Sequence, residues 1–184
     1  MENVRSSYKN NIDFNDIFDT ITFLVNPKKI VEFGILDGYS LESFVKNSST
    51  NCSIEAYDLF DDFNGNHAEF YNIKNKFNKY NNVSIKKGDF YKSLNNFKDK
   101  SIDILHIDIA NDGSTYEYAL EKYIHKISDN GIMILEGGSD ERDNVEWMIK
   151  YNKPKINPVV EKYSYEYKIK IIKKFPSITI IKNI

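Results

Sequence analysis

A short stretch near the N-terminus combines residue types that can hold a nucleoside-bearing ligand. The apolar run at residues 29–33 contains Glu32 and leads into a turn in which Gly34 and Gly38 flank three residues. Ser40 follows at the start of a segment with apolar residues at helical spacing. Glycine has no Cβ, so a ligand can come close to the backbone of such a turn. The pattern predicts a buried strand, a glycine turn and a helix N-terminus that bind one ligand.

Further strand-like runs end in acids. These runs cover residues 53–59, 83–87, 102–109 and 132–136, and the acids within or just after them are Asp58, Asp89, Asp108 and Glu136. The carboxyl ends of parallel strands meet at one edge of a sheet, where ligands bind in open α/β folds. We therefore expect these acids to lie beside the glycine turn.

Two of the acids suit a nucleoside. A carboxylate has two acceptor oxygens, so Asp58 can accept both hydroxyl protons of a ribose, and Asp61 or Asp62 can do so if the strand ends later. Asp89 can accept from an exocyclic adenine amine, with Phe90 against the ring. Surface or capping roles are the alternative for each acid.

The other two acids suit chemistry. Asp108 and Glu136 at the ends of neighbouring strands can share Mg²⁺, with Asn111 or Asp112 completing the set. Plain acid or hydrogen-bond roles are the alternative to a metal. His106 shares a face with Asp108 and has an intrinsic pKa suited to a general base, although a core imidazole bonded to backbone fits the same position.

An arginine follows the last of these strands. Arg142 lies in the first turn after Glu136 and could hold a carboxylate or phosphate of a substrate. Pairing with Glu141 or Asp143 is the alternative. Asp112, in the loop after Asp108, is expected at the same substrate site.

The elements that must position these residues alternate along the chain. Helical spacing of apolar residues occurs over 14–24 (with Asp13 as N-cap), 39–46, 70–80, 116–127 and 139–149, and Asn130-Gly131 is expected to end the fourth helix. Residues 163–171 alternate with period two, and 177–181 form a last strand. We predict an α/β fold with a Rossmann-like, doubly wound seven-stranded sheet, mostly parallel with a C-terminal antiparallel hairpin. One domain is expected, with an N-terminal helix region (1–28), a cofactor-binding core (29–150) and the hairpin (159–184).

Composition narrows the class of protein. The chain has 184 residues and a net charge of −2, with no apolar run long enough to span a membrane. Cys52 is the only cysteine, which predicts a reducing, cytoplasmic location. Residues 1–149 carry 16 basic and 25 acidic side chains, against 9 and 2 in residues 150–184. The acidic body argues against nucleic acid as a partner, and the alternating stretch Tyr163–Ile171 could support a homodimer.

The order of these motifs resembles class I S-adenosylmethionine-dependent methyltransferases. It is most similar to the small bacterial and viral O-methyltransferases of the catechol and antibiotic-sugar type. The pattern E-x-G-x-x-x-G-x-S at Glu32–Ser40 carries the resemblance, together with Asp58, Gly88-Asp89-Phe90 and Ile102–Asp108. It implies S-adenosylmethionine on the glycine turn, with Glu32 near the methionyl amino group. Metal-dependent relatives carry two successive polar ligands after strand five, whereas here Gly137 follows Glu136.

These features predict methyl transfer from S-adenosylmethionine to an oxygen of a small-molecule acceptor, for instance a sugar or related metabolite. Asp108 would position or deprotonate the acceptor, assisted by Glu136 and Mg²⁺. Two alternatives remain open: a methyltransferase-like binding module without turnover, and another nucleotide-dependent transferase on the same fold. The missing third glycine disfavours the latter, because a dinucleotide fingerprint requires it.

Overall fold

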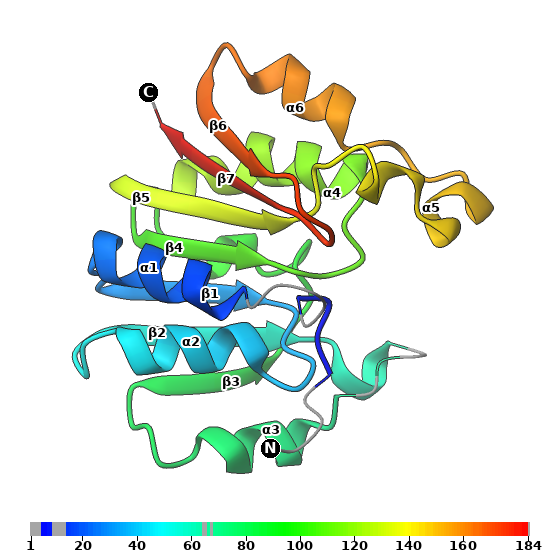
Figure 1. Ribbon diagram of the computed structural model, residues 1–184. Coiled ribbons are helices and arrows are strands. Elements are labelled where there is room, and N and C mark those ends of the chain that lie inside the picture. Colours follow the sequence, from blue (N-terminus) through cyan, green and yellow to red (C-terminus); the bar gives the residue numbers. More distant parts are fainter. Residues whose placement is uncertain (1–4, 9–13, 64–65, 67, 184) are drawn as a thin grey trace.

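The fold is organised around one sheet. The computed structural model describes residues 5–8, 14–63, 66 and 68–183. Seven strands lie in the order β3-β2-β1-β4-β5-β7-β6. Their bounds are Lys29–Phe33 (β1), Ser53–Asp58 (β2), Val83–Lys87 (β3), Ile102–Ile107 (β4), Ile127–Glu136 (β5), Tyr167–Ile172 (β6) and Ile178–Asn183 (β7). Strands β1 to β5 pair in parallel, while β7 runs antiparallel to both β5 and β6, which confirms the predicted sheet (Figure 1).

Helices cover both faces of the sheet. They are α1 (Asn15–Val25), α2 (Tyr39–Asn47), α3 (Phe70–Phe77), α4 (Gly113–Tyr118), α5 (Glu146–Lys150) and α6 (Asn157–Tyr163). Helices α1 and α2 lie on the near face in Figure 1, and α4 lies on the opposite face. The predicted N-cap Asp13 falls outside the described residues. No helix in the described part of the chain is both long and apolar enough to cross a bilayer.

Apolar residues fill the space on each side of the sheet. Ile30 and Ile104 point to the face that packs on Phe18 and Phe44, and Leu105 points to the other face. Strand β4 is therefore covered on both faces, which explains its nearly continuous apolar sequence. The packed core fixes where each strand ends, and hence where the acids lie.

The start of β5 differs from the prediction. The strand begins at Ile127, and Asn130-Gly131 lies inside it instead of ending a helix. A register irregularity between Ile102 and Ile104 of β4 accommodates the longer strand. A Cβ on Gly131 would lie 2.8 Å from the carbonyl oxygen of Ile102, so this glycine serves close strand packing.

The segment before the hairpin also differs. Residues 157–163 form α6, where no helix was predicted, and β6 starts only at Tyr167. Pro158 lies in the first turn of α6, where a missing N–H costs no helical hydrogen bond. The expected helix at 139–149 is replaced by a 3₁₀ turn at Arg142–Asn144 and the short α5.

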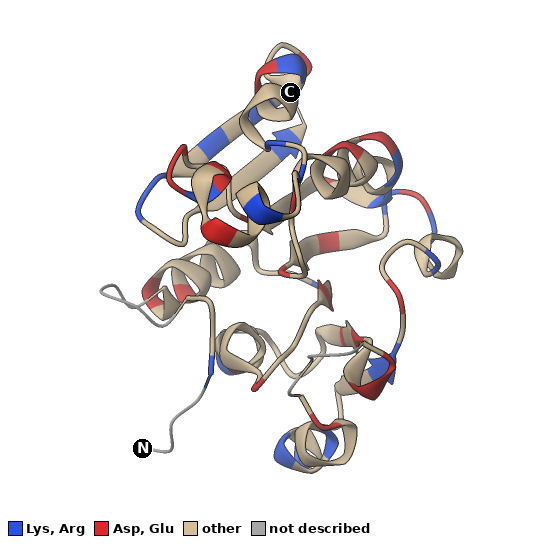
Figure 2. Cartoon of the chain, turned by 90° about the vertical axis from the view of Figure 1, so that its right-hand side faces the viewer, with Lys and Arg blue, Asp and Glu red and all other residues tan. Residues whose placement is uncertain are grey.

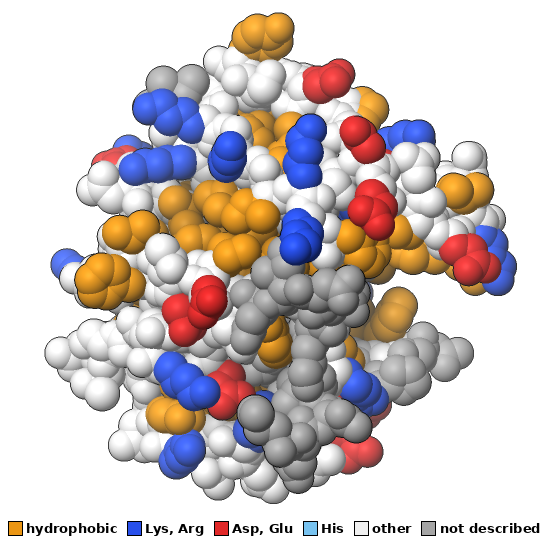
Figure 3. Space-filling model, in the orientation of Figure 1, with side chains coloured by type: hydrophobic (Ala, Val, Ile, Leu, Met, Phe, Trp, Pro, Cys, Tyr) orange, Lys and Arg blue, Asp and Glu red, His pale blue; other side chains and the backbone are white. Residues whose placement is uncertain are grey.

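Two surfaces stand out. Figure 2 looks onto the carboxyl ends of the parallel strands, and several acidic residues lie around its centre. Figure 3 shows hydrophobic side chains gathered above α1, over β5 and β7, where Ile172 and Ile180 are only partly buried. Strand β6 is an edge of the sheet, and the homodimer expected there stays a prediction.

Candidate functional site

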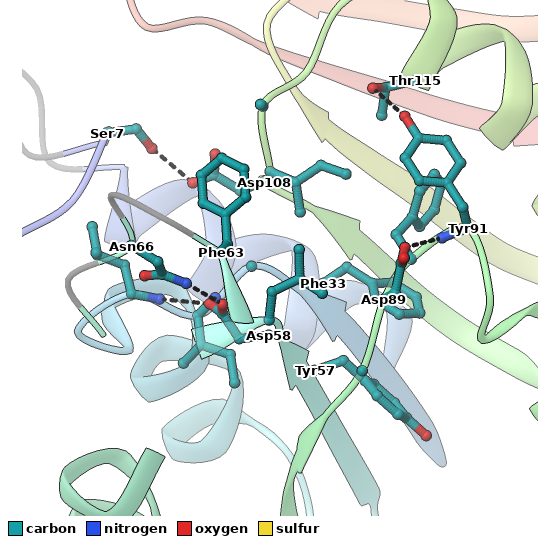
Figure 4. Close-up of a pocket in the computed structure, with 18 of the residues that line it drawn as sticks. Ser7, Phe33, Tyr57, Asp58, Phe63, Asn66, Asp89, Tyr91, Asp108 and Thr115 are labelled. Atoms are coloured by element: carbon teal, nitrogen blue, oxygen red, sulfur yellow. Dashed lines mark hydrogen bonds between the residues drawn. The ribbon is translucent and has the colours of Figure 1, made fainter. Parts of the chain in front are cut away.

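A cavity of about 700 Å³ opens at the carboxyl edge of the sheet. Its walls include residues 34–36, 57–59, 88–91 and 108–110, which lie at or just after the ends of β1, β2, β3 and β4, together with residues 5–7 and the start of α4. Figure 4 shows Asp58, Asp89 and Asp108 arranged around it. Its size and its mixture of apolar walls with a few polar groups are typical of a small-molecule site.

The glycine turn borders this cavity through Gly34. Gly34 has φ +89°, and a Cβ there would lie 1.8 Å from the carbonyl oxygen of Asp108, so only glycine lets β1 end this close to β4. Gly38 is different: it is buried at the start of α2 with φ +77°, and a Cβ there would lie 2.7 Å from the ring of Phe77. Gly38 is not part of the cavity wall, so its role is to shape the turn.

Asp58 lies in the wall and holds the turn in place. Its Oδ2 accepts from the amides of Ile35 (2.7 Å) and Leu36 (3.3 Å). Its Oδ1 accepts from the amide of Phe60 (2.9 Å) and from Nδ2 of Asn66 (2.6 Å), as Figure 4 shows in part. All four acceptor positions are thus in use. A ribose could be bound here only in exchange for one of these donors, and Asn66 is the donor on a side chain.

Aromatic residues form the end of the cavity at β3. Asp89 lies in the wall, and its Oδ1 accepts from the amide of Tyr91 (2.9 Å). Phe90 is buried and stacks on Tyr123 with ring centres 4.7 Å apart. The Tyr91 hydroxyl lies 2.9 Å from Oγ1 of Thr115, which closes this end. This end of the cavity therefore combines one carboxylate with aromatic side chains.

Asp108 stands at the other end of the cavity. Its Oδ2 accepts a hydrogen bond from the Ser7 hydroxyl (2.7 Å; Figure 4). Burial raises the pKa of Asp108, although nearby His106 and the bond from Ser7 act in the opposite direction. A carboxylate with a raised pKa is a better proton acceptor than an ordinary one.

Glu32 and His106 lie beneath the cavity, both fully buried and not in its wall. Glu32 accepts from the Ser40 hydroxyl, and its Oε1 lies 2.8 Å from Nδ1 of His106. The other ring nitrogen of His106 lies 2.8 Å from the Tyr8 hydroxyl. The expected contact of Glu32 with the ligand and of His106 with a reacting group is therefore not supported. Of this set, Ser40 alone reaches the cavity wall.

Glu136 forms a buried ion pair with Arg142. Nε and Nη2 of Arg142 lie 2.6 Å and 2.9 Å from the two carboxylate oxygens of Glu136. The guanidinium is bonded to neither Glu141 nor Asp143, which were the alternative to a substrate anion. Burial raises the pKa of Glu136 to about 7, and the bond from Arg142 opposes this rise.

The predicted Mg²⁺ set does not fit this geometry. Both oxygens of Glu136 are taken by Arg142, and Asn111 is fully buried with its Nδ2 donating to the carbonyls of Ile107 and Glu136, each at 2.9 Å. Among the residues that the structure describes, no group of three or more His, Cys, Asp or Glu side chains is arranged to hold a metal ion. A Mg²⁺ site requires several free oxygen ligands.

A second cavity of about 480 Å³ adjoins the first. The two share Ser6, Ser7 and residues 108–110. Glu136 and Arg142 lie in the wall of the second cavity, and its apolar part includes Val145, Trp147, Phe175 and Pro176. Asp112 belongs to the first cavity instead, where its Oδ1 caps α4 by accepting from the amide of Thr115 (3.1 Å).

Several wall residues carried no signal in the sequence. The N-terminal segment is held by the bidentate pair of Arg5 with Asp37 and by Ser7 on Asp108, contacts that span large sequence separations. Trp147 lies against Arg142, with the guanidinium carbon 5.0 Å from the ring centre. Tyr91 could have been found, because it directly follows the predicted Asp89-Phe90 pair.

Known proteins resemble this chain in sequence and in fold. The model of a family described as a methyltransferase domain matches residues 31–136. Similar solved structures include an O-methyltransferase from Bacillus cereus in complex with SAH (14% identity, TM-score 0.71, 98% of this chain and 85% of that chain). A second is a putative caffeoyl-CoA O-methyltransferase from Staphylococcus aureus (19% identity, TM-score 0.67, 95% of this chain and 85% of that chain). A third is the O-methyltransferase TomG from Streptomyces achromogenes in complex with SAM (11% identity, TM-score 0.70, 100% of this chain and 83% of that chain). No curated protein sequence matches the chain.

Proposed function

The chain belongs to the methyltransferase domain family, and on that premise we propose that it transfers a methyl group from S-adenosylmethionine to a hydroxyl oxygen of a small molecule. The observation that carries the proposal is the meeting of two cavities at Asp108. The larger one has room for the methyl donor, and the smaller one lies where an acceptor would approach it. Several of the similar structures are O-methyltransferases, two of them solved with SAH or SAM.

The wall of the larger cavity suits the parts of the donor. Phe90, Tyr91 and Asp89 would hold the adenine, and the region of Asp58 and Asn66 would hold the ribose. The backbone of Gly34 and the Ser40 hydroxyl would lie beside the methionyl part. Carboxylates at both ends also favour a ligand that carries sulfonium and ammonium charges.

Asp108 would perform the proton transfer. In this proposal it orients the acceptor hydroxyl and takes up its proton while the oxygen bonds to the methyl carbon and the carbon–sulfur bond breaks. The products are a methyl ether and S-adenosylhomocysteine. Ser7 would hold the carboxylate in position, and alignment of oxygen, carbon and sulfur by the cavity walls supplies much of the rate.

The acceptor would be a small hydroxyl compound, such as a sugar or related metabolite. The smaller cavity has about 480 Å³, which is in the range of small-molecule sites. The net charge of −2 also gives no attraction to a polyanion.

Methyl transfer tests the proposal directly. The protein is incubated with methyl-labelled S-adenosylmethionine and a panel of sugars, phenols and polyols, and labelled product is measured. Label in at least one neutral hydroxyl compound, lost in Asp108→Asn, is the expected result. Binding of S-adenosylmethionine without transfer to any member would instead indicate a binding module.

A further inference from the structure

The site between Asp108 and Glu136 already contains a cation, and it belongs to the chain. A divalent ion would need Glu136, but both oxygens of this carboxylate are bonded to Arg142 at 2.6 Å and 2.9 Å. The next residue is Gly137, which offers no side-chain ligand. Arg142 is only 5% exposed, so this pairing is not a surface ion pair that solvent would weaken.

The guanidinium is held so that its position is well defined. Nη2 also bonds to the carbonyl oxygen of Asn111 (3.1 Å), the amide of Arg142 bonds to the Ser139 hydroxyl (3.1 Å), and Trp147 packs on the guanidinium face. Arginine is suited to such a place because its planar fork remains charged and binds a carboxylate with two parallel bonds. A lysine could not make the same set of contacts.

One nitrogen of this guanidinium is left over. Nη1 of Arg142 is buried and has no hydrogen-bond partner among the described residues. A buried donor without a partner typically costs about 1–3 kcal/mol, so proteins usually satisfy such a group with water, an ion or a ligand. Arg142 forms part of the wall of the second cavity, where Asp108 lies as well.

We propose that Arg142 takes the place of a divalent cation in this site: it holds Glu136 with Nε and Nη2 and offers Nη1 to an oxygen of the methyl acceptor. This inference rests on the proposed function, because it assigns the second cavity to the acceptor. An acceptor would then present one hydroxyl to Asp108 and a second oxygen to Arg142. Apolar side chains, Trp147 and Phe175 among them, would pack on its body.

The charges of the site select against acidic acceptors. The single guanidinium is neutralised by Glu136, and Asp108 adds a further carboxylate to the same cavity. A carboxylate or phosphate on the acceptor would therefore meet net negative charge. The acceptor class that fits is an uncharged hydroxyl compound with a second oxygen function.

Manganese binding tests the first part without any acceptor. Mn²⁺ is titrated into wild-type protein and followed by electron paramagnetic resonance, with and without S-adenosylhomocysteine. We expect no stoichiometric site below about 1 mM Mn²⁺ in the wild type, since both oxygens of Glu136 are occupied. Arg142→Met should gain a site at least about tenfold tighter, because two carboxylates then lack their cation.

Two matched variants serve as controls. Arg142→Lys keeps a positive charge beside Glu136 and should exclude Mn²⁺ like the wild type. Lys150→Met removes an exposed positive charge from α5, the helix that carries Trp147, and should do the same. Stoichiometric Mn²⁺ binding by the wild type, or no gain in a folded Arg142→Met that still binds S-adenosylhomocysteine, overturns the inference. If the wild type does not bind S-adenosylhomocysteine, the proposed function is overturned instead.

Turnover tests the second part. Methyl transfer is measured in the presence of a chelator with two matched pairs, catechol against 3,4-dihydroxybenzoate and methyl glucoside against its glucuronate counterpart. We expect turnover to be undiminished in the chelator. In a pair whose uncharged compound is accepted, kcat/KM for that compound should be at least about tenfold higher than for its acidic counterpart. A need for added metal, equal rates within each pair, or no turnover of either neutral compound by protein that binds S-adenosylhomocysteine contradicts the assignment.

Discussion

At the scale of single residues, the bond from Ser7 to Asp108 controls how readily the proposed base accepts a proton. The Ser7 hydroxyl donates to Oδ2 of Asp108 at 2.7 Å, which favours the ionised carboxylate and lowers its pKa. Ser7→Ala should therefore raise the pKa of Asp108 further. The base must be ionised to act, so the acidic limb of the pH profile of kcat/KM should move to higher pH.

Ser6→Ala is the matched control for this prediction. Ser6 borders both cavities as Ser7 does, but its hydroxyl oxygen accepts from the amide of Tyr8 (3.1 Å) and is not bonded to Asp108. The acidic limb of the pH profile of kcat/KM for Ser6→Ala should coincide with that of the wild type. Equal profiles for Ser7→Ala and the wild type would mean that Asp108 is not the titrating base.

Gly34 should be irreplaceable for both stability and binding. Alanine would have to adopt φ +89° and place its Cβ against the carbonyl of Asp108. We expect Gly34→Ala to lower the free energy of unfolding by at least about 2 kcal/mol, and S-adenosylhomocysteine affinity to fall at least about tenfold. Urea denaturation and calorimetry measure the two effects.

Gly38→Ala separates the two effects. Gly38 also has positive φ, but it packs on Phe77 and lies outside the cavity wall. Gly38→Ala should lower the free energy of unfolding about as much as Gly34→Ala. The affinity of its folded fraction for S-adenosylhomocysteine should stay within a few-fold of the wild-type value. A loss of affinity as large as that of Gly34→Ala would show that the whole turn contacts the ligand.

At the scale of elements, Glu55 of β2 links the neighbouring strands. Its carboxylate pairs with Lys29 of β1 (2.7 Å) and Lys86 of β3 (2.6 Å). Burial opposes ionisation, but the bonds from Lys29, Lys86 and Tyr57 outweigh it and lower the pKa of Glu55 from 4.5 to about 2.

This pKa shift predicts an acid-sensitive contribution to stability. A lowered pKa stabilises the fold above about pH 4.5, and the contribution is lost as the pH falls toward about 2. The shift corresponds to at most about 3 kcal/mol before solvent screening is subtracted. When the free energy of unfolding is measured by urea denaturation, it should fall less over this pH range in Glu55→Gln than in the wild type. Glu121→Gln, at an exposed carboxylate, should behave like the wild type, and identical curves for all three would refute the role of Glu55.

The strand ends were predictable because several independent signals coincide there. Alternating strand and helix patterns placed Asp58, Asp89 and Asp108 at one edge, and the sheet order follows from the fold class. The start of β5 was not predictable, because Gly131 looks like a helix end in sequence but serves contact with Ile102. Helix α6 was missed because Pro158 reads as a break, although it is allowed in a first turn.

Side-chain pairing within the site was the least predictable feature. The sequence suggested that Glu136 binds a metal and that Arg142 binds a substrate anion, yet the two pair with each other. Similarly, Glu32 and His106 were expected near the ligand but form a buried network with Ser40 and Tyr8. Such pairings depend on side-chain directions after folding, which spacing along the chain does not specify.

At the scale of the whole molecule, the fold brings two cavities together at Asp108, the larger one proposed for the methyl donor and the smaller one for the acceptor. The ends of β1 to β4 line the larger cavity and the region after β5 lines the smaller one, while Ser6 and Ser7 of the N-terminal segment border both. Asp58 fixes the wall of the larger cavity, because its four hydrogen bonds hold the glycine turn against the end of β2. The binding of the methyl donor should therefore depend on this one carboxylate.

Calorimetric titration with S-adenosylhomocysteine tests the central claim most directly. We predict one site per chain in the wild type, with affinity weakened at least about tenfold in Asp58→Asn, because a carboxamide cannot accept from all four donors. Asp61→Asn removes an equal charge from an exposed side chain nearby, 76% exposed, and should bind within about twofold of the wild type. No heat from wild-type protein at about 1 mM ligand, or equal affinities in all three proteins, would contradict the account.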